Sequence, residues 1–485
     1  MKRQQIFGAA LVGACLVLAC VSAWGQATTG TILGNVKDQT GAAIPGVGVV
    51  ATNIDTNFSR DTISDSTGHF FIQYLPVGTY RLEAELVGFK KFVQAGIVVG
   101  IDRNARIDPV LQVGEVNETV EVTSDAPLVD TAKTVLGQTV GNAEILNLPL
   151  VNRNVYDLLS ITAGVQNTAS SNAFGPPGFE VSVYGSPNAG TGGVNYTLDG
   201  GTSIMSLRNT GNPAPNPDAV QELRITTHMF DAEYGRYGGG VVNVLTKAGT
   251  NSFHGSLFHY HRNDALNAQE WNSLEKPVQR RNQFGGSVGG PIKKDKLFFF
   301  LSYSGLRERE VAFENDARVP TALERTGDFS QMTKALIDPL TKKQFPDNKI
   351  PANRLDPTAQ NIIKDWVPLP NLPGNYYEAQ VPIRPRNDDL TGRIDYSFSD
   401  THQLFGSYFL NKGERADVLG GTLPWTERLL TWKQQNYNVN ETWTVSPVSM
   451  NLLHLTYVRH IGGRLNTPAK SLADFGSKYQ IQGEP

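Results

Sequence analysis

The sequence contains very little cysteine. Its two cysteines, Cys15 and Cys20, both lie in an N-terminal segment that has the pattern of a secretory signal. Once this segment is removed, the remaining chain has no disulfide, no thiolate metal site and no cysteine nucleophile. Packing and backbone pairing must therefore stabilise the folded protein.

The signal consists of two basic residues at positions 2–3, an apolar run over residues 6–21, and the small residues Ala23 and Gly25. This order predicts a signal peptide over residues 1–25 and export from the cytoplasm. A membrane anchor is one alternative, but the apolar run is short and residues 26–31 are polar. A lipoprotein site at Cys20 is a second alternative.

Positive and negative charges are nearly balanced in the sequence. The formal net charge is -3 and only 18% of the residues are charged. No cationic field or aromatic-basic cluster is available for phosphates and bases, so nucleic acid is not an expected partner.

Catalytic patterns are absent as well. The chain has no His-Glu-x-x-His pattern and no other local set of base, nucleophile and metal ligands, so we expect no enzymatic activity, no catalytic residue and no cofactor. His254, His259 and His261 alternate along one predicted strand, and we expect them to share a face. We interpret them as surface or lumen histidines rather than as metal ligands.

Long hydrophobic runs are missing after the N-terminal segment. A membrane helix needs about 20 apolar residues, and no later stretch provides them. A barrel strand needs only about ten residues of alternating character, because a barrel pairs its backbone groups between strands. Any membrane span of the mature chain must therefore be a barrel strand.

The sequence is rich in glycine, with 48 residues, and in short β-rich runs. This mixture favours a mainly β fold, and 485 residues are too many for a single core. The first predicted domain is a small sandwich over residues 28–112. Its expected strands lie at residues 31–36, 47–53, 69–74, 78–86, 91–99 and 106–112.

The sandwich segment resembles the carboxypeptidase regulatory-like domain, which has a transthyretin-like fold. The matching residues are 34–38, 41–47, 65–70, 75–80 and 87–89. We interpret these motifs as structural, because the glycines permit turns with positive φ. Phe70, Leu75 and Tyr80 are expected to fill the sandwich.

Residues 113–130 form a predicted linker, and part of it resembles the TonB box of TonB-dependent receptors. Its β-branched alternation without a hairpin partner is typical of a strand available to another chain. The resemblance implies contact with a TonB-type energy-coupling protein. The alternative is that the segment is the last strand of the preceding domain, or only a linker. The TonB-box-like residues are Glu118, Thr119, Val120, Glu121, Val122, Thr123 and Ser124.

Residues 131–250 resemble the plug domain of TonB-dependent receptors of the Oar-like group. Helical patches at 142–147 and 156–161 are followed by Gly-rich strands, and the family motifs occur in order at 148–153, 195–200, 220–224, 232–236 and 238–247. The candidate plug residues are Asn152, Arg153, Asp199, Gly200, Glu222, Glu233, Tyr234, Arg236, Gly238, Gly239 and Gly240.

We expect the charges of Glu222, Glu233 and Arg236 to pair with one another or with the barrel wall, because an unpaired charge in a packed lumen is costly. The alternative is that they face water in the lumen. The three glycines are expected to allow close backbone packing.

Residues 251–485 are predicted to be the N-terminal part of an Oar-like transmembrane β-barrel. Alternating segments lie at 253–262, 281–290, 296–305, 391–398, 402–411, 434–445 and 449–460. Arg393 and Asp395 fall on one face and Ile394 and Tyr396 on the other, so one face suits lipid and the other a wet lumen. A soluble antiparallel sheet also alternates, but the strand lengths and the upstream plug motifs favour a barrel.

Two further expectations concern the barrel. Seven strands cannot close a receptor barrel of about 22 strands, so we expect the chain to be the N-terminal part of a longer receptor. Residues 307–389 are rich in proline and asparagine and form a candidate ligand-facing loop.

The resemblance implies a TonB-dependent receptor embedded in the lipid of the cell outer membrane, with its N-terminal domain in the periplasm. Its function would be energy-coupled uptake of an unidentified ligand, such as a saccharide, a peptide or a metal chelate. The alternative is a non-transporting surface or scaffold protein whose sandwich domain binds carbohydrate or a protein partner.

Overall fold

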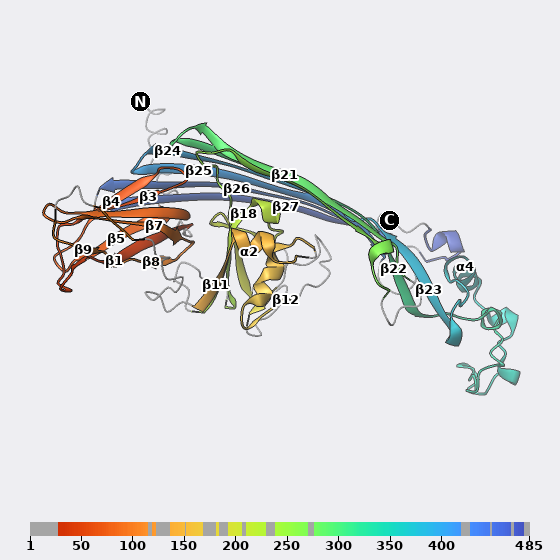
Figure 1. The fold of residues 1–485 in the computed structure, drawn as a ribbon. Coiled ribbons are helices and arrows are strands. Elements are labelled where there is room, and N and C mark those ends of the chain that lie inside the picture. The colour runs from red at the N-terminus through yellow and green to blue at the C-terminus, as the bar shows by residue number, and fades with distance from the viewer. Residues whose placement is uncertain are drawn as a thin grey trace, which may run out of the picture.

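The computed structural model describes residues 28–114, 119–122, 136–150, 152–167, 181–183, 193–205, 210–228, 238–269, 276–418, 427–446, 449–466 and 470–479. The predicted signal peptide lies outside these residues. Three parts follow one another along the chain: a small sandwich, a mixed sheet with short helices, and a long curved antiparallel sheet (Figure 1).

The N-terminal part is a sandwich of two sheets, in the strand orders β5-β1-β8 and β10-β7-β6-β3-β4. A short ladder of β2 and β9 lies beside them. The strands are β1 (Thr29–Asn35), β2 (Lys37–Asp38), β3 (Gly48–Asn53), β4 (Ser59–Ile63), β5 (His69–Pro76), β6 (Gly78–Glu85), β7 (Lys91–Val99), β8 (Asn104–Arg106), β9 (Val110–Leu111) and β10 (Thr119–Val122).

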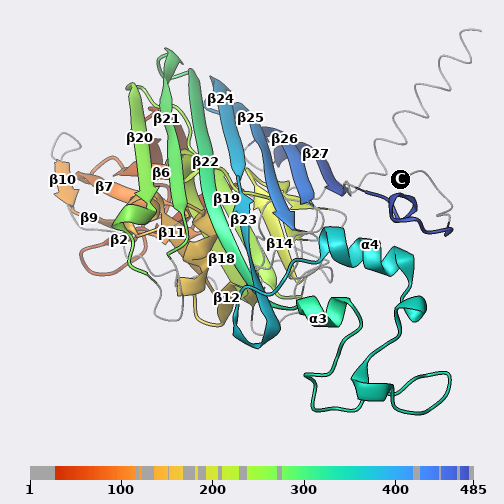
Figure 2. The same ribbon diagram turned by 90° about the vertical axis from the view of Figure 1, so that its right-hand side faces the viewer.

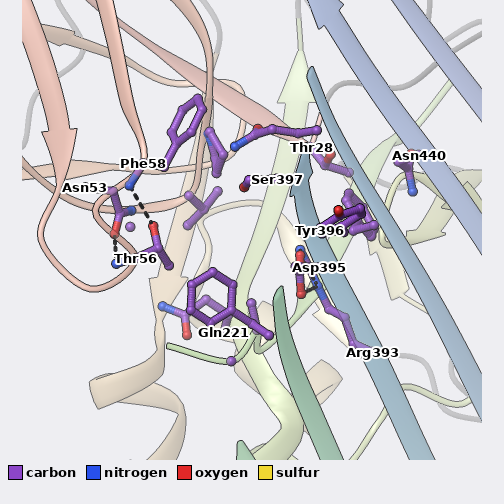
Figure 3. A pocket seen from close by; sticks show the side chains of 18 of the residues that line it. Thr28, Asn53, Thr56, Phe58, Gln221, Arg393, Asp395, Tyr396, Ser397 and Asn440 are labelled. Atoms are coloured by element: carbon purple, nitrogen blue, oxygen red, sulfur yellow. Dashed lines mark hydrogen bonds and ion pairs between the residues drawn. The ribbon is translucent and has the colours of Figure 1, made fainter. Parts of the chain in front are cut away.

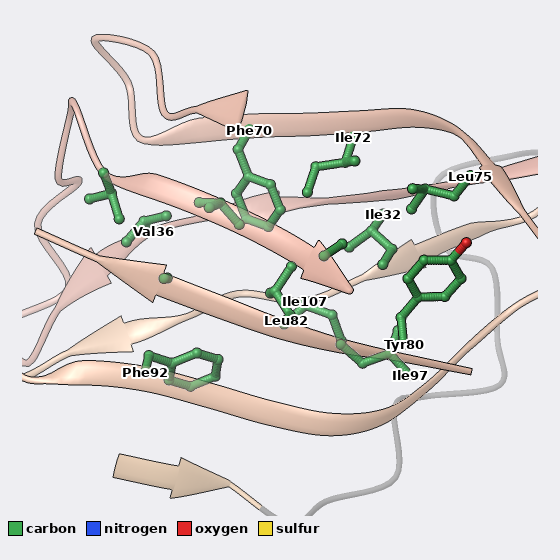
Figure 4. Close-up of a cluster of buried hydrophobic side chains, with 14 of the residues drawn as sticks. Ile32, Val36, Phe70, Ile72, Leu75, Tyr80, Leu82, Phe92, Ile97 and Ile107 are labelled. Carbon is green, nitrogen blue, oxygen red and sulfur yellow. The ribbon is translucent and has the colours of Figure 1, made fainter. Parts of the chain in front are cut away.

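Alternation of apolar residues builds the sandwich core, which Figure 4 shows. Phe70, Leu75 and Tyr80 are fully buried there, as expected. The Tyr80 hydroxyl donates a hydrogen bond to the carbonyl of Pro76 at 2.8 Å, so the buried phenol is satisfied. The sequence did not predict β4, because the polar run Ser59–Ile63 has no apolar alternation.

The second part, which corresponds to the predicted plug and is called the plug below, is a five-stranded sheet in the order β11-β18-β19-β14-β15. Every residue of β14 and β19 is buried, so both faces of the sheet are covered. The strands of this sheet are β11 (Leu136–Gly141), β14 (Val194–Leu198), β15 (Gly201–Thr202), β18 (Val220–His228) and β19 (Gly240–Thr246).

Short elements complete the second part. The helix α2 (Asn142–Asn147) has the predicted bounds, whereas the second predicted helical patch is the 3-10 helix η1 (Val155–Ile161). The other elements are β12 (Val165–Asn167), β13 (Val181–Val183), β16 (Ile204–Met205), β17 (Thr210–Gly211) and η2 (Pro217–Ala219).

The third part is an antiparallel sheet in the order β20-β21-β22-β24-β25-β26-β27, with β23 paired to the outer length of β22. It forms a curved wall, and the plug sheet lies against its concave side (Figure 2). The strands are β20 (His254–Asn263), β21 (Gln279–Lys293), β22 (Leu297–Arg318), β23 (Tyr376–Ile383), β24 (Arg386–Ser399), β25 (His402–Val418), β26 (Glu427–Ser446) and β27 (Ser449–Asn466).

The two faces of this wall differ in the manner of a membrane barrel. On β26, Asn436 and Asn438 are 0% and 2% exposed on the concave side, whereas Tyr437 and Val439 are both 41% exposed on the convex side. Polar residues are buried against the plug and apolar residues face outward, which is the reverse of a soluble protein. The predicted mainly β fold with the first strands of a barrel is confirmed.

Aromatic side chains border the outward apolar band on two levels. Tyr408, Tyr437 and Tyr457 lie side by side on adjacent strands, with ring centroids 4.7 and 6.0 Å apart. Nearer the short turns, His402 stacks between Phe398 and Trp443. Such pairs of aromatic rows mark the two interfaces of a membrane.

The connections distinguish the two ends of the wall. At one end, only two or three residues connect β21 to β22, β24 to β25 and β26 to β27. At the opposite end, the connections are longer and include residues 264–278 and 319–375. Short turns face the periplasm in transmembrane barrels and long loops face outward. The sandwich lies at the short-turn end, where the Asn57 amide donates to Asp295 at 2.9 Å.

The candidate ligand-facing loop is shorter than predicted. β22 continues to Arg318, and β23 returns beside it, so the loop proper spans residues 319–375. The sequence missed these strand extensions because their charged residues broke the alternation. The loop contains α3 (Ala322–Arg325), η4 (Pro346–Asn348), η5 (Ala352–Arg354), α4 (Pro357–Trp366) and η6 (Pro373–Asn375); η3 (Asp264–Leu266) and η7 (Ala473–Phe475) lie elsewhere.

Within the described part of the chain, no helix is both long and apolar enough to cross a membrane.

Candidate functional site

The plug is attached to the wall through a buried network centred on Asp199. This residue has a positive φ of 50°, and its carboxylate accepts hydrogen bonds from the backbone and hydroxyl of Thr246 at 2.8 and 2.9 Å. Arg393 of β24 lies 3.7 Å from the same carboxylate and donates to the carbonyl of Thr246. It also pairs with Asp395 at 2.7 Å. The network therefore joins two plug strands to one wall strand.

A row of asparagines on β26 holds the turn that contains Asp199 and Gly200. Asn438 donates to the carbonyl of Leu198 at 3.2 Å, and Asn440 donates to the carbonyl of Asp199 at 3.4 Å. The next residue, Gly201, has no room for a side chain, because a Cβ there would lie 2.1 Å from the Asn438 amide oxygen. Gly200 has φ of 80°, a conformation that favours glycine.

Asn152 and Arg153 attach the other side of the plug to β20 and β21. Arg153 forms an ion pair with Asp218, and its guanidinium lies 4.4 Å from the centre of the Phe258 ring. Arg281 of β21 donates to the side-chain oxygen of Asn152 at 2.9 Å. Asn152 and Arg153 therefore connect the plug to the wall.

Among the described residues, the Glu222 carboxylate accepts a hydrogen bond from the backbone of Ile101 in the sandwich, at 2.9 Å, a partner that the sequence did not predict. The expected pairing of Glu222 with Arg236 stays a prediction, because Arg236 lies outside the described residues. Burial raises the pKa of Glu222 to about 7, while the Ile101 hydrogen bond and the charges of Arg224 and Arg103 act in the opposite direction. No local sequence pattern predicts this contact, because it joins residues of two domains.

Glu222 fits closely against the sandwich. A Cβ on Gly100 would lie 3.0 Å from its carboxylate, so the glycine allows the approach. Beside it, Arg224 lies 4.0 Å from Asp102, whose backbone has a positive φ of 49°. The turn between β7 and β8 is therefore the sandwich's contact with the plug.

A cavity of about 170 Å³ lies where the three parts meet (Figure 3). Asn53, Thr56 and Phe58 border it from the sandwich, and Gln221 borders it from the plug. Arg393, Asp395, Tyr396 and Ser397 are among its lining residues from the wall. The volume accommodates several waters at about 30 Å³ each. The three parts therefore leave a gap at this junction, whereas elsewhere Phe409 of the wall packs into the apolar cluster of the plug.

Four of the TonB-box-like residues form β10. Thr119–Val122 pair in parallel with Lys91, Phe92, Val93 and Gln94 of β7, so the segment is the edge strand of the larger sandwich sheet. This is the position that the alternative interpretation, a last strand of the preceding domain, describes. One side of β10 is paired within the chain, and the edge position leaves its other side for a further strand. Glu118, Thr123 and Ser124 lie outside the described residues.

Glu233, Tyr234 and Arg236 of the plug motif also lie outside the described residues, so the expected pairing of Glu233 and Arg236 stays a prediction. Gly240 is described, with φ of 149°, and a Cβ there would lie 2.7 Å from the carbonyl of Thr226. The Gly239 amide donates to the carbonyl of Gly193 at 2.6 Å. Among the described residues, nothing lies within 4 Å of a Cβ placed on Gly238.

The three histidines do not share a face, contrary to expectation. His259 and His261 both contact Asn282 on the convex side, at 3.3 and 2.9 Å. His254 lies an odd number of residues away and contacts Thr250 instead, at 3.2 Å. No group of three or more potential metal ligands occurs among the residues that the structure describes.

Family models match two parts of the chain. Residues 31–112 match the carboxypeptidase regulatory-like domain. Residues 245–484 match the outer membrane beta barrel domain.

Two curated proteins are similar in sequence. The TonB-dependent transporter Oar from Myxococcus xanthus is 28% identical over 296 residues, covering 57% of this chain and 27% of that protein. The probable TonB-dependent siderophore receptor PirA from Acinetobacter baumannii is 27% identical over 198 residues, covering 38% of this chain and 24% of that protein. The matched part is thus about a quarter of the length of each relative.

Among solved structures, the outer membrane transporter YddB from Escherichia coli resembles this chain with 12% identity and a TM-score of 0.40, over 64% of this chain and 37% of that one. The family models, the sequence relatives and the inverted polarity of the wall agree on one assignment. The chain carries an outer membrane β-barrel domain and an N-terminal carboxypeptidase regulatory-like domain, is similar in sequence to TonB-dependent transporters, and is a protein of the bacterial outer membrane.

Proposed function

We propose that the protein is a TonB-dependent transporter that takes up a ligand across the outer membrane. The observation that carries this proposal is the attachment of the plug to the concave wall. Asn438 and Asn440 hold it there through hydrogen bonds to backbone carbonyls. Water can replace such bonds at a low net cost, of about 1 kcal/mol each. A plug attached in this way can be displaced or remodelled, which uptake through the barrel requires.

The energy-coupling partner would bind at residues 118–124. β10 lies at the edge of the sandwich sheet on the periplasmic side of the wall. An edge strand can add to the sheet of another protein through its main-chain groups. This placement supports a TonB-type protein as the partner, and it makes release of β10 from β7 one route by which the full segment becomes available.

The ligand would bind on the extracellular side of the plug. A cavity of about 280 Å³ lies there between residues 145–153 of the plug and the end of β20, and Arg153, Arg262 and Arg281 are among its lining residues. Glu308 and Asp218 neutralise part of this charge, through Arg281 at 3.7 Å and through Arg153. The remaining positive charge favours a polar ligand with acidic groups.

An uptake assay tests the proposal. Cells producing the full-length protein are given labelled iron chelates, oligosaccharides and peptides, in strains with and without the energy-coupling protein. We expect one class to accumulate only when the coupling protein is present. Surface binding of a ligand without energy-dependent accumulation would instead support a non-transporting receptor or scaffold.

A further inference from the structure

The convex face of the wall changes from apolar to basic within a few residues on neighbouring strands. On β21, Phe284 is followed toward the extracellular end by Asn282 and Arg280, all on the convex face. On β22, Tyr303 is followed by Arg307 and Arg309 on the same face. Arg280 pairs directly with Arg309, and Asn282 with Arg307. The cations of the two strands therefore lie side by side.

These arginines surround a cavity of about 460 Å³. Its lining includes Arg280, Arg307, Arg309, Arg384 and Arg386, together with Asn282. Glu308 also borders the cavity, but its carboxylate pairs with Arg281, which contacts the plug on the concave side. The positive charge is therefore concentrated on the convex face, away from the lumen. We call this set of five arginines the convex arginine cluster.

Carboxylates neutralise only part of the cluster. Arg307 pairs with Asp388 at 2.9 Å, and Arg386 lies 3.7 Å from Glu414. Arg280, Arg309 and Arg384 are exposed, and none of them has an acidic partner within ion-pair distance among the described residues. Three like charges held together in this way lower their free energy by binding an anion.

The position of the cluster indicates which anion is present. Arg280 lies four residues beyond Phe284 along β21, a rise of about 13 Å. Phe284 and Tyr303 are neighbours with ring centroids 6.4 Å apart, and they border the outward apolar band. The Tyr303 hydroxyl donates to Asp388 at 2.7 Å, which marks the change from apolar to polar surroundings. The cluster therefore lies at the level of the lipid headgroups at the extracellular end.

We propose that the convex arginine cluster binds the phosphate groups of a phosphorylated glycolipid in the outer leaflet. The planar guanidinium donates pairs of hydrogen bonds that match the oxygens of a phosphate, and clustered arginines suit a headgroup with more than one phosphate. The acyl chains of such a lipid would lie along the apolar band below, over side chains such as Leu301 and Val288, which are 46% and 42% exposed. A soluble anion could use the arginines but not the band.

Lipid binding to the purified full-length protein tests this inference. Native mass spectrometry in detergent measures the fraction of protein carrying added lipid A with two phosphates. Enzymatically dephosphorylated lipid A and inorganic phosphate are measured in parallel. We expect tight binding only of the phosphorylated lipid, and a loss in affinity of about tenfold or more in the triple variant R280Q/R309Q/R384Q.

The matched control removes the same charge elsewhere. Lys334, Lys342 and Lys343 are exposed in the extracellular loop, away from the cavity lining, and the variant K334Q/K342Q/K343Q should bind the lipid as the wild type does. Equal lipid affinity in the arginine variant and the wild type would overturn the proposal. Equal binding of dephosphorylated lipid, or displacement of the lipid by inorganic phosphate at similar concentration, would also overturn it. Since the readout is binding, the result does not depend on whether the protein transports a ligand.

Discussion

Glu222 is a titratable group at the contact between the sandwich and the plug. Its pKa is raised from 4.5 to about 7 by burial, so the folded state holds more protons than the unfolded state between these two values. Stability of the contact is therefore greatest at low pH and is lost as the pH rises through this window.

We predict that Glu222→Gln removes this pH dependence, because the amide oxygen can still accept from Ile101 and carries no charge. Hydrogen exchange of the backbone amides of residues 98–104 in the full-length protein measures the pH dependence of this contact. After correction for intrinsic exchange, wild-type protection should fall by up to about tenfold per pH unit toward pH 7. Glu144→Gln is the control, since this exposed carboxylate also accepts a backbone hydrogen bond, from Gly141 at 3.2 Å. A wild-type profile as flat as that of the variant would contradict the prediction.

Gly201 is the second informative residue. An alanine Cβ would lie 2.1 Å from the Asn438 side chain and 2.5 Å from the Thr456 hydroxyl. We expect Gly201→Ala to displace the turn and destabilise the seated plug by about 1–3 kcal/mol. Limited proteolysis of the plug in the full-length protein measures this effect. In Gly141→Ala nothing lies within 4 Å of the new methyl group, so this variant should be cleaved at the wild-type rate; similar cleavage of both variants would count against the close fit at Gly201.

At the scale of elements, β10 has two possible roles that one substitution can separate. If residues 118–124 pair with the coupling protein, Val120→Pro removes a backbone donor and should abolish energy-dependent uptake while surface binding persists. If β10 serves only the sandwich, the substitution should lower the melting temperature of the sandwich and leave uptake intact. Both properties are therefore measured on the same variant, and normal uptake would remove the TonB-box assignment.

The elements that the sequence predicted are those with a strong local signal. The strand around Tyr437 was predictable because polar and apolar residues alternate over residues 436–445 of β26, with Glu441 as the exception. The helix α2 was predictable from its local pattern, but the 3-10 geometry of η1 was not, because both helix types use similar residues. β23 was missed because Pro382 and the charged end of β22 hide the alternation.

The site was less predictable than the elements. The motif around Asp199 and Gly200 could be located in the sequence, but its partners come from β24 and β26, about 200 residues later. The Glu222 contact joins residues 121 positions apart, and no local pattern encodes such a pairing. Likewise the error on His254 arose from spacing alone, since five residues along a strand reverse the face.

At the scale of the whole molecule, the sandwich has a core of its own. Its buried cluster runs from Ile32 to Leu111 and shares no residue with the plug cluster. We predict that residues 28–112 expressed alone unfold cooperatively on heating. Within this segment Phe70→Ala should cost about 3–5 kcal/mol, because the ring is 1% exposed. Phe71→Ala should cost less than about 0.5 kcal/mol, because its ring is 54% exposed. A gradual melt, or equal effects of the two substitutions, would contradict an independent domain.

The asparagine row on β26 also determines how the inside of the barrel responds to water. Side-chain amides form hydrogen bonds with water about as well as with the plug. The concave wall would therefore stay hydrogen-bonded if the plug were displaced. An aliphatic wall of the same shape would expose apolar area to water on separation from the plug, at a cost in free energy proportional to that area. If the plug is displaced as proposed, water can therefore enter the space beside Asn436, Asn438 and Asn440 without a large cost in free energy.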